Sequence, residues 1–227
     1  VFVIPSWYPS KVNSSAGIFI KEQINAISIF EKSINQCIST WGHDQGHLSF
    51  RNPKTLFKAI KWRINNTSRK IINHNSNLIE LYSPCLSWTN QLPFGGYKGL
   101  LNVNRRNLKE AISLYNDINI IHAHSVYPGG VIASVLSKEF NIPYVITEHM
   151  GPRIPSLLKN GKLIDVILKA YSEASKIITV SDFLKIKLEQ FNIKNSIVIP
   201  NLVNEDVFKI GNKLNKKFTF FTLSNMV

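Results

Sequence analysis

Two short apolar segments joined by a stretch of small residues place the strongest constraint on the fold of this chain. Residues 118–121 and 144–147 are predominantly apolar, and a helix of small residues is predicted between them, after Pro128, Gly129 and Gly130. Short apolar runs separated by a helix are typical of strand–helix–strand units in a buried parallel sheet. Because ligands bind outside the carboxyl ends of the strands in such sheets, the segment also predicts where a site lies.

The rest of the chain repeats this alternation of strand and helix. The pattern indicates an α/β fold of the Rossmann-like, doubly wound kind with a mainly parallel sheet. Neither a GxGxxG nor a GxxxxGK[ST] motif is present, which counts against a standard dinucleotide-binding fold or a P-loop. The predicted strands are residues 2–5, 33–40, 78–82, 118–121, 144–147, 176–180 and 196–199, and the predicted helices are residues 18–30, 54–72, 100–115, 157–173 and 183–191.

The charge balance narrows the class of partner. The chain of 227 residues has 27 basic and 14 acidic side chains and a net charge of +13. Such a balance favours an acidic partner, whether nucleic acid, anionic lipid or a phosphorylated ligand. Cys37 and Cys85 form no disulfide framework, which suits a reducing compartment, and no apolar stretch reaches the ~18 residues of a membrane-spanning helix. We therefore expect a cytoplasmic protein.

The basic charge is concentrated on one predicted helix, residues 54–72. No acidic residue occurs between Asp44 and Glu80. Two interpretations remain open: an ordinary surface helix with its apolar side inward, or a helix that rests on an anionic membrane. The apolar face would contain Leu56, Phe57, Ile60, Ile64 and Ile71, and the face toward a membrane would contain Lys54, Lys58, Lys61 and Arg69, with Trp62 beside them.

Polar side chains follow the two central predicted strands at the edge where a ligand would bind. These residues are His122, His124, Glu148 and His149. Residues 122 and 124 share one side of a strand and can converge on one point. The set is compatible with a metal site, with a metal-free transfer site in which an imidazole contacts a hydroxyl or a developing charge, or with a structural role alone.

Two weaker features lie near the start of the chain. Gly17 precedes the predicted helix 18–30 and follows the first predicted strand, so its backbone could approach a phosphate, although an ordinary turn glycine explains it equally. His43 and His47 are four residues apart, which on a helix could bind a metal. The neighbouring Gly42 and Gly46 instead favour a solvated loop.

Six motifs occur in order along nearly the whole chain: IPSWYP, AGIFIKEQINAI, IIHAHSVYPGG, YVITEH, ASKIITVSDFLK and VIPNLVNEDVF. This ordered set resembles the N-terminal half of a bacterial retaining glycosyltransferase of the large group-1 class, family four, with the GT-B fold. The resemblance implies an N-terminal Rossmann-like acceptor-side domain at residues 1–208, a linker at 209–217 and the first strand of a C-terminal donor-binding domain at 218–227.

The resemblance also implies roles for individual residues. His124 matches the catalytic-site histidine that faces the sugar and acceptor, and Gly17 matches the loop that approaches the donor phosphates. No Asp-x-Asp pair is present, which agrees with transfer that needs neither a metal nor a cofactor. By the same resemblance, the acceptor side is lined by Glu148, His149 and His122, and the interdomain cleft by Ser181 and Asn201.

The activity implied is transfer of a sugar, with retention, from a nucleotide-sugar donor to a saccharide or lipid-linked acceptor, as in cell-surface polysaccharide biosynthesis. The enzyme would be cytoplasmic, peripheral at the inner face of the plasma membrane, and residues 1–227 alone would not turn over, because closure of two domains assembles the site. A nucleotide-sugar epimerase of related architecture is an alternative. A basic nucleic-acid-binding module is another, but the interleaved basic and aromatic pattern of single-strand binders is missing, so no nucleic-acid partner is expected.

Overall fold

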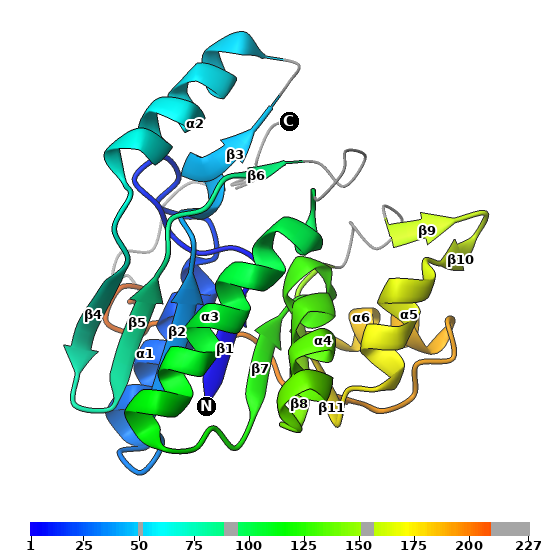
Figure 1. The fold of residues 1–227 in the computed structure, drawn as a ribbon. Coiled ribbons are helices and arrows are strands. Elements are labelled where there is room, and N and C mark those ends of the chain that lie inside the picture. Colours follow the sequence, from blue (N-terminus) through cyan, green and yellow to red (C-terminus); the bar gives the residue numbers. More distant parts are fainter. Residues whose placement is uncertain (50–51, 89–94, 151–156, 210–227) are drawn as a thin grey trace, which may run out of the picture.

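A single eight-stranded sheet organises the chain. The computed structural model describes residues 1–49, 52–88, 95–150 and 157–209. The strand order is β12-β11-β8-β7-β1-β2-β5-β4, and every neighbouring pair is parallel except β4 with β5. The chain starts in the centre with β1, builds outward through β2 and β5, and then returns to β7 on the other side of β1 (Figure 1). This is the doubly wound α/β fold that the sequence predicts.

The elements of this sheet and its helices follow the predicted alternation. The strands are β1 (Phe2–Pro5), β2 (Gln36–Thr40), β4 (Lys70–Asn75), β5 (Leu78–Tyr82), β7 (Ile121–His124), β8 (Tyr144–Glu148), β11 (Lys176–Thr179) and β12 (Ser196–Val198). The helices are α1 (Ile18–Phe30), α2 (Pro53–Asn65), α3 (Tyr97–Tyr115), α4 (Val131–Phe140), α5 (Asp165–Ser172) and α6 (Asp182–Glu189). Short elements are η1 (His43–Gly46), η2 (Val126–Gly130) and the strands β3 (His47–Leu48), β6 (Ser87–Trp88), β9 (Leu158–Lys159) and β10 (Lys162–Leu163).

Alternation along the strands divides the core between the two faces of the sheet. Phe2 and Ile4 of β1 belong to the larger buried cluster, whereas Val3 between them belongs to a smaller cluster with Ile20 and Ile24 of α1. This is expected because successive side chains of a strand point to opposite faces. Both faces of the central strands are therefore buried.

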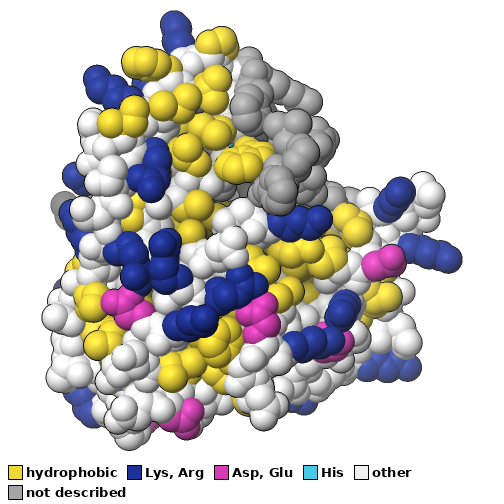
Figure 2. Space-filling view, in the orientation of Figure 1, with side chains coloured by type: hydrophobic (Ala, Val, Ile, Leu, Met, Phe, Trp, Pro, Cys, Tyr) yellow, Lys and Arg dark blue, Asp and Glu magenta, His cyan; other side chains and the backbone are white. Residues whose placement is uncertain are grey.

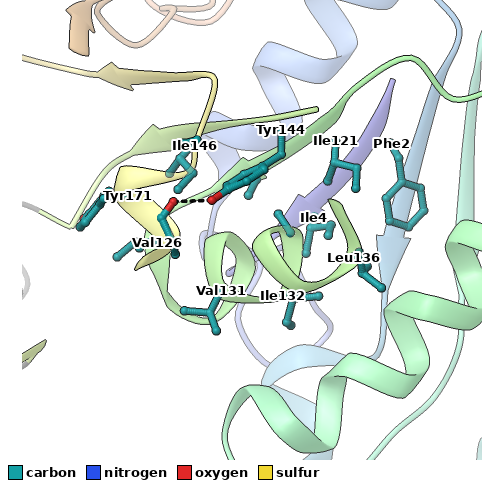
Figure 3. Packing of buried hydrophobic residues seen from close by; sticks show 14 of the residues in the cluster. Phe2, Ile4, Ile121, Val126, Val131, Ile132, Leu136, Tyr144, Ile146 and Tyr171 are labelled. Atoms are coloured by element: carbon teal, nitrogen blue, oxygen red, sulfur yellow. Dashed lines mark hydrogen bonds between the residues drawn. The ribbon is translucent and has the colours of Figure 1, made fainter. Parts of the chain in front are cut away.

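The packing of α4 on the central strands positions the edge at which the site lies. Figure 3 shows Val131 and Ile132 of α4 beside Ile4, Ile121 and Ile146 of three neighbouring strands. The hydroxyl of Tyr144 in β8 donates to the Ala170 carbonyl of α5 at 2.7 Å, which joins that helix to the same layer. These contacts fix the ends of β7 and β8 relative to the start of α4.

The predicted helix 54–72 is wrong in its second half. α2 begins after Asn52, whose side chain accepts from the backbone N–H groups of Lys54 and Thr55, and ends at Asn65. The run Asn65-Asn66-Thr67-Ser68 has low helix propensity, and the β-branched Ile71 and Ile72 that follow pair with β5. Residues 70–75 are therefore an edge strand.

Other boundaries also differ from those predicted. The strand predicted at residues 118–121 is β7, which begins at Ile121 and extends through His122 to His124, because it pairs with β1 and β8 along its whole length. The helix predicted at 157–173 begins only at Asp165, and part of the segment before it forms the β9–β10 hairpin. The strand predicted at 33–40 begins at Gln36.

The predicted linker (209–217) and final strand (218–227) lie, apart from Lys209, outside the described residues. Among the described residues, no helix combines the length and the apolar character that a membrane span requires.

Candidate functional site

The carboxyl ends of β1, β2, β7 and β8 meet at one edge of the sheet. The strand order reverses between β1 and β7, so this edge is a topological switch point, where open α/β sheets bind their ligands. The backbone N–H of Ser6, just after β1, donates to the carbonyl of His124 at the end of β7. The polar residues predicted from the sequence follow these same strands.

Three histidines converge here, as the sequence predicts. Nδ1 of His124 lies 3.2 Å from Nε2 of His149, within hydrogen-bonding distance. The rings of His122 and His124 are 4.4 Å apart, and Nε2 of His122 lies 2.7 Å from the Thr147 hydroxyl. Phe19 of α1 contacts the His149 ring with a centroid separation of 4.6 Å. We call His122, His124 and His149 the histidine cluster.

Burial keeps the histidine cluster uncharged. Desolvation lowers the pKa of His122 and of His149 to about 4. It lowers the pKa of His124 well below the ordinary value, with a further contribution from the neighbouring imidazoles, and His124 is 0% exposed. Nε2 of His124 and Nδ1 of His149 have no hydrogen-bond partner. The cluster thus offers neutral imidazole nitrogens with unused hydrogen-bonding capacity.

The Glu148 carboxylate is fully buried and its contacts are internal, and the acceptor-side role predicted for this residue stays a prediction. One oxygen accepts from the Val126 N–H at 2.9 Å and the Tyr171 hydroxyl at 2.7 Å. The other accepts from the N–H groups of His149 and Met150 at 2.9 and 2.7 Å. Burial raises the pKa of this carboxyl, and the four donors oppose that shift. Glu148 therefore holds the start of η2 and the end of β8 in place.

We expect Glu148→Gln to destabilise the protein by about 3 kcal/mol or more. An amide presents one acceptor and one NH₂ group, so two of the four buried donors lose their partner, and each unsatisfied buried group costs about 1–3 kcal/mol. Urea unfolding measures the change. The matched control is Glu139→Gln, because Glu139 pairs with Arg105 at the surface, where such pairs contribute less than about 1 kcal/mol. Equal stability of the two variants would contradict this role of Glu148.

A pocket that the sequence did not predict opens at the same edge. Its volume is about 450 Å³, and Ser6 and Tyr127 on its wall follow β1 and β7. The sequence interpretation assigned residues 42–52 to a solvated loop, but His43, Asp44 and His47 line this pocket. The aromatic walls come from Trp7, Trp41, Trp88 and Tyr127. We call it the aromatic pocket.

His43 is held rigidly in the wall of the aromatic pocket. Its ring stacks on Trp41 with a centroid distance of 4.0 Å, and Nε2 lies 3.1 Å from the Pro5 carbonyl. Burial lowers the pKa of His43 to about 4, so the ring is neutral near pH 7. Because the Pro5 carbonyl can only accept, Nε2 carries the proton and Nδ1 is the acceptor of the ring. The sequence signal that could have indicated this pocket is the presence of tryptophans just after predicted strands, as at Trp7 and Trp41.

The model of the family described as Glycosyltransferase Family 4 matches residues 80–207, which is more than half of the chain. The chain belongs to glycosyltransferase family 4. An uncharacterized glycosyltransferase of Methanocaldococcus jannaschii is 32% identical over 118 residues. That match covers 50% of this chain but 32% of the relative, so the chain spans about a third of that relative's length.

Among solved structures, Arabidopsis thaliana UGT89C1 complexed with UDP-L-rhamnose is similar, with a TM-score of 0.49 and 12% identity. The superposition covers 89% of this chain and 52% of that chain.

Within this glycosyltransferase family 4 chain, local contacts within the protein account for two of the other residues predicted at the cleft, Gly17 and Ser181. Gly17 has a φ of 66°, and a Cβ there would lie 2.5 Å from the Trp7 carbonyl oxygen, so backbone geometry alone requires glycine. The Ser181 hydroxyl caps α6 by accepting from the Leu184 N–H at 3.3 Å. Asn201 lies exposed beyond β12. Their contacts with a donor remain predictions.

The residues predicted to face a membrane do not all lie on one exposed face of α2. Lys54, Lys58 and Lys61 are exposed on α2. Trp62 turns inward, and a Cβ at Gly42 would lie 2.3 Å from its ring. Arg69 lies off the helix, pairs with Glu110 and donates to the Ser83 hydroxyl at 3.2 Å. Trp62 and Arg69 are therefore wrongly assigned to that face.

No group of three or more His, Cys, Asp and Glu side chains within the described ranges is arranged to hold a metal ion.

Proposed function

We propose that this chain is the acceptor-side part of a retaining glycosyltransferase that uses a nucleotide-sugar donor. The observation that carries the proposal is the aromatic pocket at the switch point of the sheet, where Ser6 of the pocket wall donates its N–H to the carbonyl of His124. Family membership supports the sugar-transfer chemistry. In the reaction, the bond between the sugar C1 and the diphosphate oxygen breaks, a new bond forms between C1 and the acceptor oxygen, and the proton of the acceptor hydroxyl passes to the departing diphosphate.

We assign the aromatic pocket to the acceptor, a saccharide or the sugar of a lipid-linked glycan. Aromatic faces cover the apolar faces of a sugar ring, while a few placed polar groups fix its orientation. Asp44 and the neutral His43 supply acceptors for its hydroxyl groups. These features suit a neutral, hydroxyl-rich ligand better than a phosphate, because the wall combines indole rings with an acidic side chain.

His124 is proposed to face the transferred sugar. It is the fully buried member of the histidine cluster, and its Nε2 has no partner in the protein. A neutral imidazole can hydrogen-bond a sugar hydroxyl or stabilise charge as the glycosidic bond breaks. Nδ1 of His124 lies 3.2 Å from Nε2 of His149, and Nε2 of His122 contacts the Thr147 hydroxyl.

The domain boundaries remain part of the proposal. Residues 1–208 would form the acceptor-side domain, 209–217 a linker and 218–227 the first strand of a donor-binding domain, with Gly17, Ser181 and Asn201 facing the cleft between them. The nucleotide would bind mainly to that second domain, so residues 1–227 alone are expected to bind nucleotide weakly and not to transfer sugar. The activity would serve cell-surface polysaccharide synthesis in the cytoplasm, with no metal or cofactor.

The test is a nucleotide-sugar screen on the longer protein that contains both domains, measuring nucleoside diphosphate release with and without a saccharide acceptor. Asp44→Ala and His47→Ala are both exposed in the aromatic pocket, so they should fold normally and raise the acceptor KM about tenfold each, with the donor KM unchanged. Asp117→Ala, exposed at the opposite end of the sheet, is the matched control.

Three results would count against the proposal. Release of an epimerised sugar with no glycoside product would indicate an epimerase. Strong inhibition by a chelator would restore a metal-dependent reaction. An acceptor KM that is unchanged in both pocket variants would move the acceptor site elsewhere.

A further inference from the structure

The helix α2 touches the rest of the protein along a narrow side. Ala59 is its only buried residue. Trp62, one turn later, packs against the backbone of Gly42 and Gly46, where an added Cβ would lie 2.3 and 2.8 Å from the ring. Figure 1 shows α2 standing above the sheet, beside β3. The inward side of α2 is therefore narrow, and most of the surface of this helix does not pack against the rest of the described protein.

The side of α2 that faces away from the protein is apolar. Phe57, Ile60 and Ile64 are spaced by three and seven residues, which places them in one row on a helix. Their exposed fractions are 67%, 41% and 68%. The interpretation in which the apolar side of this helix lies inward is therefore wrong. A row of large apolar side chains in water, unlike single scattered ones, indicates an interaction site.

Basic side chains border this apolar row. Lys54, Lys58 and Lys61 are exposed on the adjoining side, and none of them forms an ion pair with a carboxylate in the described part of the chain. No acidic residue occurs from Gln45 to Ile79. Figure 2 shows apolar and basic side chains side by side at the top of the molecule, where α2 lies, with no acidic side chain among them in this view.

We propose that this face of α2, made of Phe57, Ile60 and Ile64 with Lys54, Lys58 and Lys61, docks on an anionic membrane surface. An interfacial helix inserts its apolar row at the boundary of the acyl chains, while the lysines contact lipid phosphates. A nucleic acid would match the lysines but would leave the apolar row in water. Charge and apolarity together therefore favour a membrane.

The position of α2 connects this face to the aromatic pocket. The Trp62 contact rests on Gly42 and Gly46, and the residues between and just after them, His43, Asp44 and His47, line that pocket. A docked α2 would hold the pocket close to the lipid surface. This step rests on the proposed function, and it narrows the acceptor to a sugar carried on a lipid.

The experiment is co-sedimentation of the purified chain with vesicles of phosphatidylcholine alone and of phosphatidylcholine mixed with phosphatidylglycerol. We expect binding to the anionic vesicles that weakens as salt is raised. Changing Lys54, Lys58 and Lys61 together to Gln should lower the partition coefficient about 100-fold, since each lysine near an anionic surface contributes about 1 kcal/mol, roughly fivefold. Phe57→Gln with Ile64→Gln should lower it at least about tenfold.

The matched controls remove the same chemistry elsewhere. Lys159, Lys162 and Lys194 are exposed lysines outside α2, and changing all three to Gln removes an equal charge. Ile29→Gln with Phe30→Gln removes two exposed apolar side chains from α1. Both controls should bind vesicles as the unchanged chain does, and circular dichroism establishes that every variant is folded.

Four outcomes would overturn the proposal. They are absence of binding to anionic vesicles, equal loss of binding in the α2 and control variants, binding of RNA in place of vesicles, and a dimer that forms through Phe57 and Ile64 without vesicle binding. Because vesicle binding is measured without donor or acceptor, its failure would leave the proposed sugar transfer intact. A chain that binds vesicles while the longer protein transfers no sugar would retain the docking face and reject the function.

Discussion

Replacing His124 with alanine in the longer protein is expected to lower turnover by about 10²–10³-fold, the usual cost of losing one preorganised polar contact to a transition state. Because the ring is 0% exposed, the change should also destabilise the fold by about 2 kcal/mol or more. The two effects are separated by measuring kcat at saturating substrate on protein shown to be folded by thermal melting.

His122 supplies the matched control for that experiment. It lies two residues earlier on the same strand, but its Nε2 already contacts the Thr147 hydroxyl. His122→Ala should therefore destabilise the protein while changing kcat by less than about tenfold. If the His124 variant keeps full turnover when folded, or if both variants lose turnover equally, His124 does not face the transferred sugar.

Lowering the pH from about 7 to about 4 is expected to remove several kcal/mol of stability. Burial lowers the pKa of His43, His122 and His149 to about 4, whereas an unfolded chain has imidazoles of pKa about 6.5. Between these values the unfolded state binds more protons than the folded state, so stability rises with pH across this window. The stability that these neutral imidazoles contribute is fully present above about pH 6.5 and is lost as the pH falls toward 4.

Glu148 acts in the opposite direction, because burial raises the pKa of its carboxyl and protonation then favours the folded state. Because three histidines oppose this one carboxyl, we expect the net effect of lowering the pH to be a loss of stability. Urea unfolding at a series of pH values measures the net slope, and His122→Asn should make that slope smaller because one buried imidazole is removed. A stability that is flat between about pH 4.5 and 6.5 would show that these rings are not held neutral.

The alternation of strands and helices could be predicted from the sequence because apolar runs and helical spacing are local signals. The end of α2 could not, since residues 69–72 continue the helical spacing of apolar and basic side chains while their pairing with β5 depends on a distant segment. The histidine cluster was predicted because adjacent parallel strands end together. Its burial was not, because the extent of β7 depends on β1 and β8.

The aromatic pocket could not be predicted from the sequence, for a different reason. Trp7, Trp41 and Trp88 lie on three separate segments, and no spacing in the sequence relates them. The strand-end position of Glu148 predicted a place at the site, and the family resemblance implied that it lines the acceptor side. Its four donors come from the segment after β7, from α5 and from the backbone just beyond β8 itself, and only the folded chain brings them together.

The contacts of Glu148 couple two parts of the molecule mechanically. Its carboxylate holds the N–H of Val126, and the next residue, Tyr127, is part of the wall of the aromatic pocket. The same carboxylate holds the N–H of His149, whose ring contacts His124. One buried side chain therefore fixes both the backbone next to the pocket wall and the backbone of His149, so the geometry of the pocket and that of the histidine cluster depend on the same carboxylate.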